Sequence, residues 1–349
     1  MTFNPHGVGV ANGNIFGFPV DESSASLVII PIPWDATASY KKGTSDGPKA
    51  ILEASTQLDY FHPNLSKAYD TNVFMAPIST DWLTINERLN LDAAPYFSAL
   101  ESLGEEQAGN AYRETIQTIN EAQIALCNNL EERALSLINS GKICAVLGGE
   151  HSAPLGLIKA LDKSYDSFSV LQIDAHADLR NAYEGFTQSH ASIMYNVLQE
   201  CPHVDRLVQV GIRDLSEEEF ELTQRDTRIN TFFDWEIKQG QFMGKSWKEQ
   251  CQDIVNCLSE RVYFSFDIDG LRPELCPNTG TPVPGGFSLA EVSYLLFMVV
   301  ASGRQVIGFD LNEVAPSMNG DWDANVGARA LWELVTATEL SRRNYAGSH

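Results

Sequence analysis

The stretch from Phe168 to Asp178, FSVLQIDAHAD, decides the fold, because it begins as an almost unbroken apolar run and ends in three residues of metal-binding type. Such a run indicates a buried strand of a parallel sheet, and α/β sheets place their ligands at the carboxyl ends of these strands. Asp174, His176 and Asp178 are spaced at i, i+2 and i+4, so in extended backbone their side chains point the same way. One such residue is more often a solvated loop group, but three together favour a single site.

Composition places the chain among large α/β proteins. With 349 residues and 44% hydrophobic content it can bury a large core, and one domain is expected. No window is apolar enough to span a membrane and the first residues lack a signal-peptide pattern, which predicts a cytoplasmic protein. Six cysteines without a CxxC pair suggest neither disulfides nor a cysteine zinc site. The formal charge of −22 argues against nucleic acid and anionic membranes and fits a small cationic substrate.

Strands and helices alternate along the chain in the rhythm of a parallel sheet. Strands are predicted at 27–32, 143–147, 168–173, 207–212, 262–266 and 306–311, with helices after Pro48, at 154–161, 289–300 and 325–339, and one long or broken helix at 105–140. Residues 62–103 show no clear period. We expect a three-layer α/β/α fold with a central, mostly parallel sheet. It forms one domain over 1–349, with an N-terminal extension at about 1–26 and a helical insertion at about 62–140.

Three other predicted strands also end in candidate site groups. His151 follows the strand at 143–147, Asp267 and Asp269 follow the strand at 262–266, and Glu313 follows the strand at 306–311. A lone histidine at such a turn is more often a helix-terminus contact than a ligand, and a lone glutamate is more often solvated or capping. Here the pattern of the 174–178 cluster repeats. The glycine pair before Glu150 is expected to let the backbone pass close to a metal.

The candidate ligands are two histidines and four aspartates, which are more than one closed site normally takes: His151, Asp174, His176, Asp178, Asp267 and Asp269. Six such groups suit two divalent ions that share carboxylates. Oxygen-rich donors without thiolate favour manganese, with nickel or iron as alternatives, and disfavour structural zinc. Two ions about 3.5–4 Å apart can activate a water molecule, which indicates hydrolysis.

These motifs carry a family resemblance that spans nearly the whole chain, from GTSDGPKAI at 43–51 to NVGAR at 325–329. GGEHS at 148–152, DAHAD at 174–178, SHAS at 189–192, SFDIDG at 265–270 and FDLNE at 309–313 resemble, in order, the signature of the ureohydrolases. That family includes arginase, agmatinase, guanidinobutyrase, formimidoylglutamase and guanidine hydrolase. The resemblance implies hydrolysis of a guanidino group to urea and an amine or ammonia.

The resemblance also implies a role for each matching residue. Two carboxylates would bridge both ions, and each ion would take two further ligands: Asp174 and Asp267 as bridges, His151 and Asp178 on one ion, His176 and Asp269 on the other. His190 would pass a proton to the leaving nitrogen, a role suited to an unperturbed pKa near 6.5. Glu313 would hold the planar guanidinium through a forked, charge-assisted hydrogen bond. Family proteins assemble as trimers or hexamers, so a homo-oligomer is expected.

Two departures from the common pattern bear on the substrate. Arg272 stands where the family commonly has an aspartate, which puts local charge pairing of that loop in doubt. The loop PIPWDATASY and the stretch YEGFTQSHASIMYN look more similar to the guanidine-hydrolase branch, which can prefer nickel. We therefore expect a small guanidine compound, with guanidine itself included. Trp34 and Tyr183 are candidate pocket residues, and Trp34 would exclude larger substrates.

Three alternatives stay open. Within the class, the protein could be an agmatinase, a guanidinobutyrase or a hydrolase of substituted guanidines or biguanides. Outside it, an inactive metal-binding partner subunit would be expected to lack a ligand or the shuttle histidine, and both are present. A deacetylase-like hydrolase would share the fold, but the guanidinium-directed glutamate argues against it.

Overall fold

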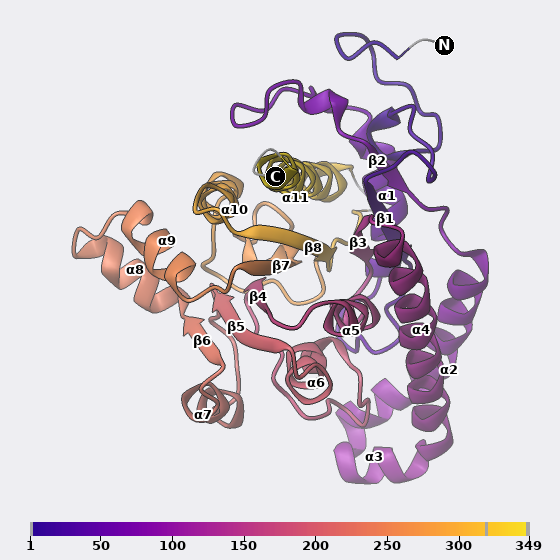
Figure 1. Ribbon diagram of the computed structural model, residues 1–349. Helices are drawn as coiled ribbons and strands as arrows, with labels where there is room; N and C mark the ends of the chain where they lie inside the picture. The colour runs from indigo at the N-terminus through magenta and orange to yellow at the C-terminus, as the bar shows by residue number, and fades with distance from the viewer. Residues whose placement is uncertain (1–2, 318–319, 347–349) are drawn as a thin grey trace.

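The computed structural model describes residues 3–317 and 320–346, which build an eight-stranded sheet with helices on both faces (Figure 1). Every strand pair is parallel. The spatial order is β2-β1-β3-β8-β7-β4-β5-β6. In chain order the strands are β1 Leu27–Ile32, β2 Val73–Met75, β3 Ile143–Gly148, β4 Phe168–Ile173, β5 Val204–Val210, β6 Ile229–Phe232, β7 Arg261–Asp267 and β8 Gln305–Asn312. The predicted three-layer α/β architecture is confirmed.

Two apolar clusters, one on each face of the sheet, form the core. Because successive strand residues point to opposite faces, Ile29 of β1 joins one cluster and Val28 the other. The first cluster includes residues of α1, α9, α10 and α11, and the second includes residues of α2, α4, α5 and α6. The helices are α1 Gly47–Ser55, α2 Thr80–Leu103, α3 Glu105–Ala111, α4 Arg113–Asn139, α5 Leu155–Ser164, α6 Ile193–Glu200, α7 Glu217–Arg225, α8 Asp234–Phe242, α9 Trp247–Asn256, α10 Leu289–Ala301 and α11 Trp322–Ala346.

The strand order brings distant parts of the chain to one edge. β3 and β4 follow each other in sequence but are separated in the sheet by β8 and β7. Their carboxyl ends lie level, since Leu147 pairs with Leu311 and Ile173 pairs with Phe266. Parallel sheets place ligands where the winding direction changes, outside the carboxyl ends. The loops after β3, β4, β7 and β8 are therefore neighbours at such a point.

The least clear part of the sequence contains one strand that was not predicted and one helix that lies inside the predicted helical insertion at about 62–140. Residues 62–103 include the short edge strand β2 and the 24-residue helix α2, whose buried face has Leu89, Ala93 and Tyr96 at helical spacing. Ser79 caps α2 by accepting a hydrogen bond from the Trp82 amide. The segment 105–140 is a broken helix, with α3 and α4 meeting at Tyr112.

The N-terminal extension is tied to the sheet edge by the buried side chain of Asn14. Its amide nitrogen donates to the Val73 carbonyl of β2 at 3.2 Å, and its amide oxygen accepts from the Met75 amide at 2.8 Å. Ile15, Phe16 and Phe18 add their side chains to the first core cluster. This part of the extension therefore belongs to the folded body.

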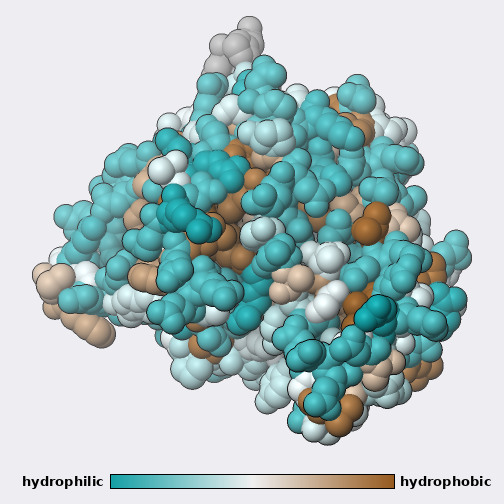
Figure 2. Space-filling model, turned by 90° about the horizontal axis from the view of Figure 1, so that it is seen from below, coloured by the Kyte–Doolittle hydropathy of each residue, from teal (hydrophilic) through white to brown (hydrophobic). Residues whose placement is uncertain are grey.

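The surface is mainly hydrophilic on the face shown in Figure 2, where hydrophobic residues gather only in small patches. Large exposed apolar side chains occur singly or as a short pair, for example Phe61 and the neighbours Phe242 and Met243. Scattered residues of this kind are normal for a globular protein. Within the ranges 3–317 and 320–346, none of the helices combines the length and apolar character that a membrane crossing requires.

Candidate active site

The first group of candidate ligands surrounds His151, which follows β3. Its Nδ1 atom lies 3.0 Å from Asp174 Oδ2, 3.0 Å from Asp178 Oδ2 and 3.4 Å from Asp267 Oδ2. These carboxylates come from the loop after β4 and from the end of β7. All four side chains are buried. Ligand atoms of His151, Asp174 and Asp267 lie close enough together to hold one ion.

The second group shares Asp174 with the first. His176 Nδ1 lies 3.0 Å from Asp269 Oδ2 and 3.7 Å from Asp174 Oδ1. These three residues form a second set that could hold an ion. Asp174 thus offers one oxygen to each set, as the bridging scheme requires. Asp267, the other predicted bridge, belongs only to the first set here.

The residues of the two groups fit divalent cations. Among the described residues, His151 Nδ1 has no aligned hydrogen-bond partner although it is buried and close to three carboxylates. Burial, and then the neighbouring Asp174, raises the pKa of Asp178 to about 7. Burial and Asp269 raise the pKa of Asp267 well above its usual value. A buried cluster of this kind is unfavourable unless cations neutralise it, and its oxygen and imidazole donors suit manganese or nickel.

Neighbouring groups hold these ligands in place. The Gln172 side chain donates to Asp174 Oδ2 at 2.8 Å, and the Ser265 hydroxyl lies 2.9 Å from His151 Nε2. Arg213 Nη2 donates to the backbone carbonyl of Asp269 at 2.7 Å. Hydrogen bonds of this kind fix the orientation of ligand side chains.

The structure gives a packing reason for glycine at positions 148 and 149, just before Glu150. A Cβ atom on Gly148 would lie 1.9 Å from Asn312 Oδ1, and a Cβ atom on Gly149 would lie 2.0 Å from the Trp34 carbonyl oxygen. The pair therefore lets the ends of β1, β3 and β8 approach one another. The expectation that the pair lets the backbone pass close to a metal stays a prediction.

Backbone strain is concentrated near the candidate ligands. Of the five non-glycine residues with positive φ in the described ranges, three are Asp178, Glu184 and Glu313. Residues other than glycine rarely adopt a backbone conformation with positive φ. Proteins retain such strain mainly at functional sites.

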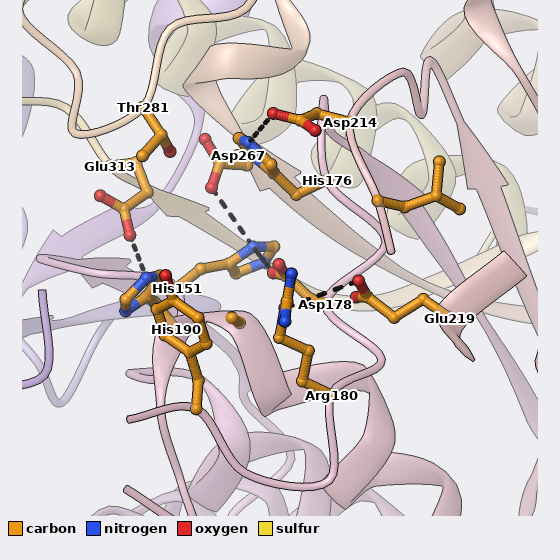
Figure 3. A pocket seen from close by; sticks show the side chains of 13 residues that line it. His151, His176, Asp178, Arg180, His190, Asp214, Glu219, Asp267, Thr281 and Glu313 are labelled. Carbon is orange, nitrogen blue, oxygen red and sulfur yellow. Dashed lines mark hydrogen bonds and ion pairs between the residues drawn. The ribbon is translucent and has the colours of Figure 1, made fainter. Parts of the chain in front are cut away.

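A cavity of about 180 Å³ opens beside the two ligand groups (Figure 3). Glu313 lines it, and its Oε1 atom accepts a hydrogen bond from the His151 amide at 2.8 Å. Its Oε2 atom has no hydrogen-bond partner among the described residues. Burial, and then Glu150, raises the pKa of Glu313 well above its usual value. A cation in this cavity would stabilise the charged carboxylate.

His190 lies at the start of a short 3-10 helix, His190–Ser192, and lines the same cavity. Its ring meets the Tyr183 ring edge-on at 5.6 Å between centroids, and its Nδ1 atom lies 3.3 Å from Thr37 Oγ1. Burial, followed by the charges of His176 and Lys42, lowers the pKa of His190 to about 3. The imidazole is therefore neutral in the resting site, in contrast to the unperturbed value expected from sequence.

The two predicted pocket residues lie in different places. Tyr183 lines the cavity and also an adjoining space of about 60 Å³ that is bounded by Ala38–Lys41, Gly280 and Thr281. Trp34 is fully buried and packs edge-on against Trp82 at 6.3 Å between ring centroids. It lines neither space, so its predicted role in excluding substrates has no structural support. Arg272 is paired with Glu274 at 3.3 Å on the exposed loop.

Several cavity residues were not predicted from sequence. Arg180 stacks over the Tyr183 ring, pairs with Glu219 at 3.6 Å and faces the cavity with it. Asp214 lies 3.9 Å from His176 Nε2 (Figure 3). Arg180, Asp214 and Glu219 lie outside the motifs recognised in the sequence. Glu150 stood inside the GGEHS motif but was assigned no role.

Comparison with known proteins decides the family. The model of the Arginase family matches residues 25–337. The chain belongs to the arginase family. Its members normally bind a binuclear divalent metal centre, which agrees with the two groups that share Asp174. As an arginase-family ureohydrolase the protein is a hydrolase of the C–N bonds of amidines, and the deacetylase alternative loses its support.

Other arginase-family proteins resemble this chain along most of its length. It is 32% identical to an N(1)-aminopropylagmatine ureohydrolase of Thermus thermophilus over 308 residues, which cover 88% of each chain. It is 30% identical to the agmatinase of Bacillus anthracis over 311 residues, covering 87% of this chain and 89% of the other. The crystal structure of the agmatine ureohydrolase of Thermoplasma volcanium matches its fold with a TM-score of 0.70 at 22% identity, covering 96% of each chain.

Proposed function

We propose that this arginase-family protein hydrolyses the guanidino group of a linear cationic guanidine with an amine-bearing tail, agmatine or an agmatine derivative. The observation that carries the proposal is Glu313, a buried carboxylate with one oxygen free toward a cavity that also contains both ligand groups. A planar guanidinium presents paired N–H donors that match a carboxylate. The names of the similar proteins support a substituted guanidine rather than guanidine itself.

Two divalent ions held by His151, Asp174, His176, Asp178, Asp267 and Asp269 would acidify a water molecule and polarise the reacting centre. Glu313 would hold the guanidinium so that its carbon faces that water. The water oxygen adds to this carbon, the bond from carbon to the tail nitrogen breaks, and urea leaves with an amine. Because His190 is neutral in the resting site, the proton that it gives to the leaving nitrogen must first come from the reacting water.

The adjoining space gives the tail a path out of the reaction site. It shares Tyr183, His190, Thr281 and Glu313 with the main cavity and continues along Ala38–Lys41. A substrate held by Glu313 at its guanidinium can therefore extend its tail between the Tyr183 ring and the loop that follows β1. Guanidine would leave this space unused.

The test is urea release from protein loaded separately with Mn²⁺ and Ni²⁺. The substrates are agmatine, N(1)-aminopropylagmatine, guanidinobutyrate, arginine, a biguanide, methylguanidine and guanidine. We expect kcat/KM to be highest for agmatine or its aminopropyl derivative. Preferred turnover of guanidine would return the small-substrate hypothesis to first place. No urea from any of them would refute the proposed class.

A further inference from the structure

A chain of hydrogen bonds runs behind the cavity, from α4 to His190. Gln123 Nε2 donates to Ser152 Oγ at 3.1 Å, and Ser152 Oγ donates to Glu150 Oε1 at 2.7 Å. Thr37 donates twice to the same carboxylate, through its amide to Oε2 at 3.0 Å and through its hydroxyl to Oε1 at 2.7 Å. Gln123, Ser152, Glu150 and Thr37 are all buried.

The proton of the Thr37 hydroxyl decides the direction of the last link. A hydroxyl has one proton, and the 2.7 Å bond to a carboxylate oxygen is shorter and stronger than the 3.3 Å contact with His190. Thr37 Oγ1 is therefore left with its lone pairs toward His190. It accepts from the His190 backbone amide at 3.3 Å and faces the ring atom Nδ1 at the same distance.

We infer that Thr37 is a positioning residue that holds His190 as the tautomer with the proton on Nδ1. Nε2 is then the unprotonated atom, and within the described part of the chain it has no hydrogen-bond partner. His190 lines the cavity whereas Thr37 does not, so Thr37 acts on the reaction only through the imidazole. In this tautomer, Nε2 can take the proton of the reacting water and return it to the leaving nitrogen.

Tyr183 completes the support of the ring from another side. Its edge-on contact with His190 limits rotation of the imidazole, and Arg180 lies over the Tyr183 ring at 5.0 Å. This packing restricts rotation of the His190 ring, but it does not determine which ring nitrogen carries the proton. The hydroxyl of Thr37 supplies that distinction.

The direct test is nitrogen-15 NMR of protein with labelled histidine side chains, loaded with Zn²⁺ so that the spectrum stays diamagnetic. The His190 signals are those that disappear in His190→Gln. Wild type should show the Nδ1–H tautomer, and Thr37→Val should lose that preference while Thr37→Ser keeps it. A wild-type His190 with its proton on Nε2, or an unchanged tautomer in Thr37→Val, would overturn the inference.

Kinetics give the second readout and rest on the proposed function, whereas the NMR result does not. We expect Thr37→Val to lower kcat about 10- to 100-fold with KM changed less than about 3-fold, and Thr37→Ser to recover most of the loss. Thr44→Val is the matched control, because Thr44 is equally buried and its hydroxyl has no partner in the described ranges. Equal losses in both valine variants would indicate a packing effect and contradict the assignment.

Discussion

Asp174 is the residue on which the two candidate metal sets depend most, because its two oxygens face different histidines. Oδ2 lies 3.0 Å from His151 Nδ1, and Oδ1 lies 3.7 Å from His176 Nδ1. Gln172 and the His176 amide each donate to one of these oxygens. The carboxylate is therefore oriented before any ion arrives, at the cost of keeping a buried acidic group whose pKa is raised mainly by burial.

Replacing this carboxylate should separate metal binding from stability. We expect Asp174→Asn to reduce bound Mn²⁺ or Ni²⁺ from two ions to one or none and to lower urea release at least about 100-fold, because a bridging charge is lost. In metal-free protein the same change should alter the melting temperature by only a few degrees, because the loss of a buried like charge offsets the new contact between the asparagine NH2 group and one of the two donors, Gln172 or the His176 amide. Metal analysis and circular dichroism measure both.

The control for this variant is Asp253→Asn on the surface, where Asp253 is half exposed and paired with Lys245. Its metal content and activity should equal those of wild type. Full metal content in Asp174→Asn would remove Asp174 from the site.

The candidate ligands could be predicted from sequence because each follows a buried strand at a spacing that orients its side chain. The support of His190 could not be predicted in the same way. Thr37 and Glu150 are 113 positions apart, and their contact exists only because β1 and β3 are neighbours in the sheet. Burial likewise changed the expected behaviour of His190, whose pKa falls to about 3.

At the scale of elements, the junction after β1 and β3 places the GGEHS segment against the loop that follows β1. Gly149 donates to the Ile32 carbonyl at 2.9 Å, and Glu150 donates to the Trp34 carbonyl at 2.8 Å. The pairing of the two strands thus continues beyond their ends. It brings Glu150 within reach of Thr37 and leaves no room for a side chain at position 149.

We expect Gly149→Ala to destabilise the fold by about 3 kcal/mol or more, because its Cβ would meet a backbone oxygen that no side-chain rotation can move. Gly109→Ala in α3 is the matched control, since nothing lies within 4 Å of its Cβ. That change should stabilise the protein by about 0.5–1 kcal/mol. Urea denaturation measures both, and equal stabilities for Gly149→Ala and wild type would contradict the packing argument.

The strands that were not predicted, and the helix α2 whose bounds were not predicted inside the helical insertion, share a weak apolar signal. β2 has only three residues. β6 has four residues, and only its first residue, Ile229, is buried. α2 has Pro95 inside it, and most of its 24 residues face outward or lie partly exposed. The central strands carry long apolar runs because helices cover both of their faces. The strands in the centre of the sheet, which are buried on both faces, were therefore predicted, whereas the short edge strands and the bounds of the partly exposed helix α2 were not.

At the scale of the whole molecule, the ligands come from three strands that are far apart in sequence, so the unfolded chain cannot hold both ions in this arrangement. Added Mn²⁺ or Ni²⁺ should therefore raise the melting temperature, with about 2.7 kcal/mol gained at a free metal concentration of about 100 times Kd. Differential scanning calorimetry of metal-free protein measures this. Asp174→Asn should show a much smaller rise, and an equal rise in both proteins would place the stabilising ions elsewhere.

The position of β8 has a consequence for the newly made protein. β8 lies between β3 and β7 in the sheet, yet among the strands of residues 3–317 and 320–346 it comes last in the chain. Until residues 305–312 have left the ribosome, His151 and Asp267 have no common scaffold, although both are already in the growing chain. Loading of the first ligand set, which needs His151, is therefore expected to come late in biogenesis, whereas the second set follows β4 and β7, which pair directly and do not need β8.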